Sequence, residues 1–406
     1  MPATKADRLS TYREKRSADR TPEPFGRASS KGGRLFVVQH HAARTLHYDL
    51  RLEMEGVLRS WAVPKGPSPN PADKRLAVHV EDHPLEYADF EGRIPEGNYG
   101  AGASIVWDRG LWKPLADPTE GLAKGKLLFE LKGHKLRGKW TLIKTKRGPK
   151  DWLLIKERDS WATDDGTDAY PPDSVLSGLT VQALKEGVDP AKSILKKLKQ
   201  LGAIKKRVAA KKTKVMLAQS GEPFSRAGWL FEIKYDGYRL LAVRESDEVV
   251  LYSRAGNNLT GTFPEIANAV RALPFVHVIV DGEAVVHDDH GIPSFSLLQK
   301  RGRLLRRQDI QRAAVKLPAT LYAFDLLAFD DYDLRQLPLT KRKLLLKELL
   351  PSIGPIRYSD HLEKHGTTMY EHVRQLGLEG VIAKKADSPY RAGRSSQWVK
   401  IKVEQT

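Results

Sequence analysis

The stretch Trp229-Leu-Phe-Glu-Ile-Lys-Tyr-Asp-Gly-Tyr-Arg239 lies near the middle of the chain and carries its most informative pattern. Apolar and aromatic residues typical of a β-strand lead to Lys234, an Asp-Gly pair predicts a tight turn, and Arg239 follows. A lysine amine becomes a nucleophile when it is deprotonated and held in one orientation, which a strand end beside cationic groups achieves. Taken alone, the same residues also describe an ordinary hairpin with a solvated lysine.

Five further elements follow downstream in a fixed order, and they favour the catalytic interpretation over the hairpin. The series resembles the covalent nucleotidyltransferase superfamily, which includes the ATP-dependent DNA ligases and the RNA capping enzymes, from about Met216 to Lys402. The resemblance implies an α+β, ATP-grasp-like nucleotidyltransferase domain that uses ATP and either Mg²⁺ or Mn²⁺. The elements are Lys234–Arg239, Ser253–Asn258, Val280–Ala284, Tyr322–Leu327, Glu379–Lys385 and Trp398–Lys402.

The resemblance gives each matching residue a role. Lys234 is the nucleophile that forms a lysyl-AMP, while cations and a metal stabilise the charge that builds on the α-phosphate. Simpler structural roles also fit, because Phe324 suits a core aromatic and Glu283 a turn carboxylate. Lys400 and Lys402 are two residues apart and also suit the solvated face of a strand. The resemblance implies that Arg239 and Arg254 hold the ribose and phosphates, that Glu283 contacts the ribose or a metal, and that Glu379 binds the metal. It also implies that Phe324 stacks on the adenine, that Glu232 lies near the adenine edge, and that Lys400 and Lys402 neutralise the α-phosphate.

The first third of the chain carries a second pattern, in which polar and apolar residues alternate as in a β-strand. Between Leu46 and Leu52, the residues His47, Asp49 and Arg51 fall on one face. Imidazole and carboxylate groups placed in this way bind divalent transition metals, and an arginine beside them binds phosphate. Single histidines on strands are usually structural, but the grouping favours a metal site here. The other members of the group are His41, Lys65, Arg75 and His83.

From about Leu9 to Trp161, this region resembles the 3′-phosphoesterase domain of bacterial DNA ligase D. The family reaction trims a 3′-terminal ribonucleoside and then removes the 3′-phosphate, so the resemblance implies end healing with Mn²⁺. The family often has an acid where this chain has Ser17, ahead of Glu23, and we expect this change to weaken the nuclease step more than the phosphatase step. The implied metal ligands are His41, His47 and Asp49, the catalytic residues are His47, Arg51 and His83, the phosphate-binding residues are Arg51, Lys65, Arg75 and Tyr87, and Gln39 supports the site.

The composition is consistent with these assignments and excludes other classes. The 406 residues carry a formal net charge of +18, which favours a polyanionic partner. The chain has no cysteine, so it has neither a disulfide scaffold nor thiol catalysis. No apolar run reaches the length of about 20 residues that a membrane-spanning helix needs, and the polar N-terminus does not resemble a secretory signal. We expect a monomer of the bacterial cytoplasm that associates with the nucleoid.

Shifts in composition predict four segments. Residues 1–33 are polar and end in a Gly/Ser-rich run, which predicts a flexible arm. Residues 34–159 alternate short strands with Gly/Pro turns, which predicts a β-barrel-like phosphoesterase domain. Residues 160–214 become basic and predict a linker that either follows a DNA backbone or is simply solvated. Residues 215–406 predict the α+β adenylyltransferase domain. Its expected helices span 263–273, 339–350 and 366–377.

Together the resemblances imply a DNA-end repair protein of the ligase D type, which acts in non-homologous end joining on double-stranded DNA ends and nicks, with a Ku-like protein as its expected partner. Related ligases continue into an oligonucleotide-binding barrel, and because this chain ends at Thr406 we expect that barrel to be absent. Two alternatives stay open: an end-healing phosphoesterase with a ligase module that does not seal nicks, and a non-catalytic adaptor that binds DNA ends. An RNA-capping guanylyltransferase shares the lysine motif, but the phosphoesterase region favours DNA.

Overall fold

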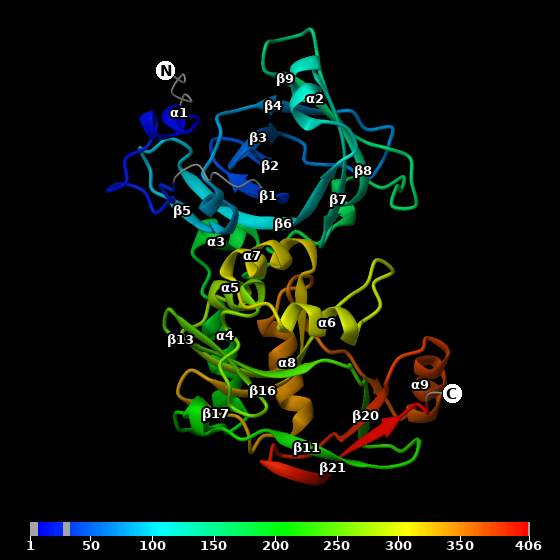
Figure 1. The fold of residues 1–406 in the computed structure, drawn as a ribbon. Coiled ribbons are helices and arrows are strands. Elements are labelled where there is room, and N and C mark those ends of the chain that lie inside the picture. The colour runs from blue at the N-terminus through cyan, green and yellow to red at the C-terminus, as the bar shows by residue number, and fades with distance from the viewer. Residues whose placement is uncertain (1–6, 27–32, 405–406) are drawn as a thin grey trace. The chain divides into compact units, whose positions relative to one another are not determined.

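The fold consists of two units, Met1–Val188 and Asp189–Thr406 (Figure 1). Each unit has its own hydrophobic core. The structure is a computed structural model, and it describes residues 7–26 and 33–404. Helices and strands occur in both units, which confirms the predicted α+β class. Over the described ranges, no helix combines the length and the apolarity that crossing a membrane requires.

A closed barrel of eight antiparallel strands forms unit 1 (Figure 1). β1 pairs with both β2 and β6, which closes the ring, and β5 (Gly92–Ile94) pairs with β6 outside it. Buried and more exposed side chains alternate along β7, as expected for a strand with one face on a core. Trp61, Trp112 and Trp140 belong to this core. The barrel strands are β1 (Leu35–Ala42), β2 (Leu46–Met54), β3 (Val57–Val63), β4 (Arg75–His79), β6 (Gly102–Pro114), β7 (Lys126–Gly133), β8 (Arg137–Lys144) and β9 (Asp151–Lys156).

Strands β1 and β2 carry the predicted metal ligands on the face that points away from the barrel core. Leu50 and Leu52 belong to the core cluster, so the residues that alternate with them, among them Asp49, lie on the opposite face. The antiparallel register places His41 of β1 directly opposite His47 of β2. The barrel therefore brings together residues that are separated in the sequence by a turn.

The segment expected to be a flexible arm is folded onto unit 1 wherever it is described. Leu9 and Tyr12 are buried on either side of the start of α1 (Ser10–Glu14), and Glu23 is buried as well. These residues are packed rather than flexible, contrary to the prediction, because two apolar side chains and several ion pairs anchor an otherwise polar segment. Residues 1–6 and 27–32 of the expected arm lie outside the described residues.

The expected linker, residues 160–214, is divided between the two units instead of standing apart from them. Val175 and Leu176 are buried in unit 1, and Ile194 and Leu198 are buried in unit 2. These apolar residues are spaced among many charges, so the charge pattern alone did not reveal them. The elements of the segment are the short helical turns η2 (Thr167–Ala169) and η3 (Ala210–Lys212), the helices α3 (Val181–Glu186) and α4 (Pro190–Gln200), and the strand β10 (Ile204–Lys205).

Two sheets form the centre of unit 2. The larger has the order β10-β17-β16-β15-β13-β14 with β18 beside β16, and the smaller has the order β11-β21-β20-β12-β19. Phe324 of the larger sheet packs edge-to-face on Trp398 of the smaller, with ring centroids 6.0 Å apart, so the sheets meet at this point. The remaining strands are β11 (Met216–Ser220), β12 (Trp229–Ile233), β13 (Tyr238–Glu245), β14 (Glu248–Ser253), β15 (His277–Val286), β16 (Ala319–Phe329), β17 (Tyr332–Asp333), β18 (Ile356–Tyr358), β19 (Leu362–Glu363), β20 (Gly380–Lys385) and β21 (Gly393–Lys402).

The three helices predicted in the second half of the chain are confirmed as α5, α8 and α9. Helix α8 packs along β16 of the larger sheet (Figure 1). The helices not yet given are α2 (Pro118–Lys124) and the 3₁₀ helix η1 (Leu85–Asp89) in unit 1, and α5 (Pro264–Ala272), α6 (Phe295–Gly302), α7 (Arg307–Lys316), α8 (Leu339–Leu349) and α9 (Gly366–Gln375) in unit 2.

Candidate active sites

Two histidines and an aspartate form the centre of the unit 1 site. The ligand atoms of His41, His47 and Asp49 all lie within 4.8 Å of one another. His41 Nδ1 is 3.9 Å from Asp49 Oδ2, and His47 Nε2 is 3.6 Å from Asp49 Oδ1. Imidazole suits several transition metals and carboxylate suits Mn²⁺. The chemistry of this donor set therefore fits a divalent metal ion.

Backbone carbonyls fix the orientation of both imidazole rings. His41 Nε2 lies 2.9 Å from Gly100 O, and His47 Nδ1 lies 2.8 Å from Thr45 O. Because a carbonyl only accepts, each of these nitrogens donates its N–H, and the opposite nitrogen of each ring directs its lone pair toward Asp49. Such a second hydrogen bond is typical of metal-binding histidines. Burial lowers the pKa of His41, which favours the neutral form that binds metal.

Arg51 connects the metal cluster to a buried polar network. Its guanidinium donates to Asp49 Oδ2 at 3.0 Å and to Gln39 Oε1 at 2.8 Å. A further N–H donates to Ser60 Oγ at 2.9 Å, and Ser60 Oγ lies 3.4 Å from His83 Nδ1. Burial, together with neighbouring arginine charges, keeps the pKa of His83 well below its ordinary value. His83 is therefore neutral in the free protein.

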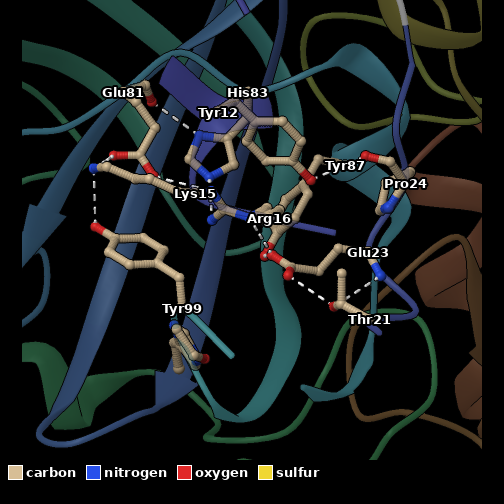
Figure 2. Close-up of polar contacts among 12 residues, drawn as sticks. Tyr12, Lys15, Arg16, Thr21, Glu23, Pro24, Glu81, His83, Tyr87 and Tyr99 are labelled. Carbon is tan, nitrogen blue, oxygen red and sulfur yellow. Dashed lines mark hydrogen bonds and ion pairs between the residues drawn. The ribbon is translucent and has the colours of Figure 1, made fainter. Parts of the chain in front are cut away.

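The N-terminal segment joins this network through buried ion pairs (Figure 2). Arg16 donates to Glu23 Oε1 at 2.9 Å and to Glu81 Oε1 at 3.1 Å. Arg16 Nη2 also lies 3.5 Å from His83 Nε2. Tyr87 Oη donates to Glu23 Oε1 at 2.9 Å. Buried charges are tolerated when they are paired, so these contacts hold the segment against the site.

In unit 2, Lys234 lies directly after β12 and is anchored to the smaller sheet. Its backbone N–H donates to Gly380 O at 2.8 Å, and its ammonium group pairs with Glu379 Oε2. Lys402 Nζ lies 3.6 Å from the second carboxylate oxygen of Glu379. The Lys234 and Glu379 side chains are 18% and 20% exposed, so a ligand can reach a pair that is largely shielded from water. The predicted nucleophile, one predicted metal ligand and one predicted phosphate lysine are thus brought together.

Arg239 is fixed on the larger sheet by a bidentate ion pair. Its Nε and Nη2 donate to the two carboxylate oxygens of Asp281 at 2.5 and 2.7 Å. Glu283 lies opposite Arg239 in the register of β13 and β15. Burial raises the pKa of Glu283 to about 7, and the positive charges of Arg239 and Lys234 oppose that rise. A bound cation would favour its ionised form, so this carboxyl fits a metal ligand.

Glu232 is the centre of a buried cluster that contains two lysines. Lys343 Nζ and Lys384 Nζ each lie 2.8 Å from a Glu232 carboxylate oxygen. Burial raises the pKa of Glu232, but the two ammonium groups outweigh this effect and hold it below its ordinary value. Lys384 Nζ lies 4.1 Å from the ring centroid of Phe324, and Arg239 Cζ lies 4.5 Å from it. The ring predicted to stack on adenine therefore contacts two cations.

Comparison with known proteins identifies two protein families, one for the region of each cluster. The family described as "DNA Ligase D 3'-phosphoesterase domain" matches residues 39–144, and the family described as "ATP dependent DNA ligase domain" matches residues 207–402. The "Multifunctional non-homologous end joining protein LigD" of Pseudomonas aeruginosa is 43% identical over 416 aligned residues, which cover 100% of this chain and 48% of that protein. The chain contains both of these domains and is similar to ligase D along its whole length.

A second curated relative is also similar over almost the whole chain. The ligase D protein of Mycolicibacterium smegmatis is 36% identical over 414 residues, covering 99% of this chain and 46% of that protein. The chain thus spans about half the length of the curated relatives it matches. The solved structure "mycobacterial DNA ligase D complexed with ATP and MES" is 35% identical, with a TM-score of 0.42, and the match covers 48% of this chain and 62% of that one. The ATP-dependent DNA ligase domain implies the use of ATP and a divalent metal.

The structure gives the positions of four other residues that the two resemblances assign to phosphate. Lys65 is exposed directly after β3, and Arg254 is exposed on the turn after β14. Arg75 pairs with Asp73 Oδ2 at 2.8 Å. Lys400 lies partly exposed on β21, opposite Ile382. Long side chains of this kind reach an anion only once it is bound, so their roles stay predictions.

Three charged residues that contact predicted site residues were not singled out from the sequence. Lys384 lies within the motif from Glu379 to Lys385, which was a signal that it belongs to the site. Arg16 stands beside Ser17, in the segment expected to be flexible. Only one feature of the sequence pointed to Lys343. Its helical spacing from the apolar residues of α8 places it on the buried face of that helix.

Proposed function

We propose that this chain is a DNA-end repair enzyme with two chemical centres. Unit 1 heals 3′ ends by removing a terminal ribonucleoside and the 3′-phosphate, and unit 2 transfers AMP from ATP to Lys234 as the first step of strand joining. The observation that carries the proposal is that each unit holds its own preassembled cluster of charged groups. In unit 1 this is the His41, His47 and Asp49 set, and in unit 2 it is the contact of Lys234 with Glu379.

In unit 1, His41, His47 and Asp49 would hold Mn²⁺, which would supply charge stabilisation at the phosphate oxygens and lower the pKa of a water molecule. Arg51 neutralises the terminal phosphate, and its own bond to Asp49 fixes its position. His83 Nδ1 lies 2.9 Å from a backbone carbonyl, so Nδ1 donates its N–H and Nε2 is the nitrogen that accepts a proton or a hydrogen bond. Water attacks the phosphorus, a new phosphorus–oxygen bond forms while the bond to the sugar oxygen breaks, and a proton from the water passes to that sugar oxygen, which leaves a 3′-hydroxyl and inorganic phosphate.

In unit 2, Lys234 Nζ attacks the α-phosphorus of ATP, a nitrogen–phosphorus bond forms, and pyrophosphate leaves. The ammonium group loses its proton first, and Glu379 is positioned to take it because it already accepts the hydrogen bond. Arg239 and Lys402 supply positive charge near the phosphates. Mg²⁺ or Mn²⁺ bound at Glu283 and Glu379 would add further charge neutralisation there.

The proposed substrates are double-stranded DNA ends and nicks, and the formal net charge of +18 supports a polyanionic substrate. Recruitment by a Ku-like end-binding protein and action at the nucleoid are proposed from the resemblance to ligase D and from the end-joining role in the names of the relatives. The chain acts as a monomer in this proposal.

Two assays test the function directly. After incubation with α-labelled ATP and Mg²⁺, the denatured chain is expected to retain label. DNA with a 3′-phosphate is expected to lose that phosphate with Mn²⁺ and to keep it after addition of a chelator. Phosphate release without label would leave only the end-healing alternative. Salt-sensitive DNA binding with neither reaction would favour a non-catalytic adaptor.

A further inference from the structure

The loop between β5 and β6, residues 95–101, contacts the metal cluster of unit 1 through Gly100 and carries a half-exposed aromatic ring. Tyr99 is 47% exposed, although the residues on both sides of it are tied down. Asn98 Nδ2 donates to Arg20 O at 3.2 Å, and Gly100 O accepts from His41 Nε2 at 2.9 Å. Consecutive Cα atoms are about 3.8 Å apart, so the backbone of Tyr99 is fixed next to a residue that contacts a metal ligand.

Two basic side chains lie over this ring (Figure 2). Lys15 Nζ is 4.6 Å from the Tyr99 ring centroid and 3.3 Å from Tyr99 Oη. Arg16 Cζ is 5.1 Å from the same centroid. Both cations are themselves fixed by Glu81, at 3.0 Å from Lys15 and 3.1 Å from Arg16. The ring and its cations are therefore held in place before any ligand binds.

An exposed aromatic ring next to fixed cations has the chemistry of a binding surface for single-stranded nucleic acid. Bases stack on the aromatic face, and the cations attract the backbone phosphates. A tyrosine that served packing alone would bury its ring. Here Tyr99 is pinned by its neighbours and still leaves about half of its surface to solvent.

We propose that Tyr99 is the platform on which the base of the 3′-terminal nucleotide stacks, so that the attached 3′-phosphate reaches the metal cluster. This inference rests on the proposed phosphoesterase function and adds a substrate-positioning residue to it. The terminal base is the one that fits, because Tyr99 is next in sequence to Gly100, which contacts His41. Every base has a π-face, so the platform accepts all four bases.

The competing explanation is structural, since the hydroxyl of Tyr99 bonds to Lys15 and helps to fix the N-terminal segment. Tyr99→Phe removes the hydroxyl and keeps the ring, whereas Tyr99→Leu keeps apolar bulk and removes the stacking face. Stacking predicts that Tyr99→Leu raises KM for 3′-phosphate removal about tenfold with little change in kcat, and that Tyr99→Phe stays close to wild type. Trp161→Leu is the matched control, because Trp161 is also half-exposed beside an arginine.

A substrate with an abasic 3′-terminal sugar completes the test. Wild type is expected to show a KM about tenfold higher on the abasic end than on the normal end, and Tyr99→Leu is expected to add nothing on the abasic end. A purely structural role would raise KM equally on both substrates, and that result, or a Tyr99→Phe variant as impaired as Tyr99→Leu, would overturn the proposal.

A binding assay separates this inference from the proposed reaction. Fluorescence of a terminal 2-aminopurine is quenched when the base stacks on an aromatic ring, and we expect this quenching to disappear in Tyr99→Leu and to persist in Tyr99→Phe. Quenching that depends on Tyr99 without any phosphate release would refute the reaction and keep the platform. Phosphate release with quenching that is equal in wild type and Tyr99→Leu would refute the platform alone.

Discussion

Substitution of single residues in the Glu232 cluster should show which of its charges contributes most to the stability of unit 2. The cluster contains one carboxylate and two ammonium groups, and all three side chains are at most 2% exposed. Glu232→Gln leaves two buried lysines without a counter-charge. Lys343→Met leaves the ion pair of Glu232 with Lys384 intact. We therefore expect the loss of the acid to be the more damaging change.

The contacts give the expected magnitudes. Lys343 Nζ makes two hydrogen bonds, to Glu232 and to Ser359 O, each at 2.8 Å. Methionine fills most of the same space, so Lys343→Met should lower the free energy of unfolding by about 2 kcal/mol. Removing one partner of a buried ion pair costs about 3–5 kcal/mol, which is the loss expected for Glu232→Gln. The double variant should lose less than the sum, because Lys343 is then no longer left unpaired.

The effect of pH on Glu232→Gln follows from Lys384. Burial lowers the pKa of Lys384 to about 8, and the charge of Glu232 opposes that shift. A lysine with a lowered pKa in the folded state binds fewer protons there than when unfolded, so the free energy of unfolding rises with pH between about 8 and the ordinary value of 10.5. Without the charge of Glu232, the pKa of Lys384 lies further below its ordinary value than in wild type, so the variant gains stability with pH from a lower pH. The loss caused by Glu232→Gln should therefore shrink as pH rises toward about 8 and stay constant above it.

Native-state hydrogen exchange can measure these differences within one unit of a two-unit chain. Amides of β12 and β20 report on the opening of unit 2, and amides of β7 and β8 in unit 1 serve as the internal control. A larger loss in Lys343→Met than in Glu232→Gln would refute the reasoning. A loss in Glu232→Gln that does not change with pH would also contradict it.

Three further results are expected. Glu283 has its pKa raised to about 7, so it binds more protons folded than unfolded and destabilises unit 2 progressively as pH rises from 4.5 to 7. Glu283→Gln should therefore raise the melting temperature above pH 7, with the gain vanishing toward pH 4.5, and an equal gain at both ends of this range would contradict the assignment. Glu379→Gln should slow labelling of Lys234 by about a hundredfold, because it removes the group that accepts the proton, and a rate near that of wild type in rapid-quench assays would exclude this role. Glu23→Gln removes the charge that Arg16 pairs with, so hydrogen exchange in residues 10–14 should speed up and 3′-phosphate release should fall, whereas unchanged exchange would show that the segment is held by other contacts.

Part of the unit 1 cluster could be predicted because its members lie on neighbouring strands at short spacing. His47 and Asp49 are two residues apart on β2, and strand alternation alone puts them on one face. The sequence could not show that His41 lies opposite His47, since strand register depends on the whole barrel. The resemblance to ligase D supplied that ligand before the register was known.

The residues that were missed act across long separations in the chain. Arg16 reaches Glu81 and His83 only because the N-terminal segment folds onto the barrel, and its polar composition predicted a flexible arm. Lys343 meets Glu232 from a helix more than a hundred residues away, since the two are 111 positions apart. Composition and periodicity describe local structure, so pairings of this kind become visible only in the folded chain.

The central claim is that two independent centres lie on one chain. The most direct test inactivates each centre in turn and measures both reactions. Lys234→Ala and Asp49→Asn would be compared with wild type for AMP labelling and for 3′-phosphate release in parallel reactions. The account predicts that Lys234→Ala loses the label and keeps phosphate release, and that Asp49→Asn loses phosphate release and keeps the label. If either substitution abolished both reactions in a folded protein, the two-centre account would be contradicted.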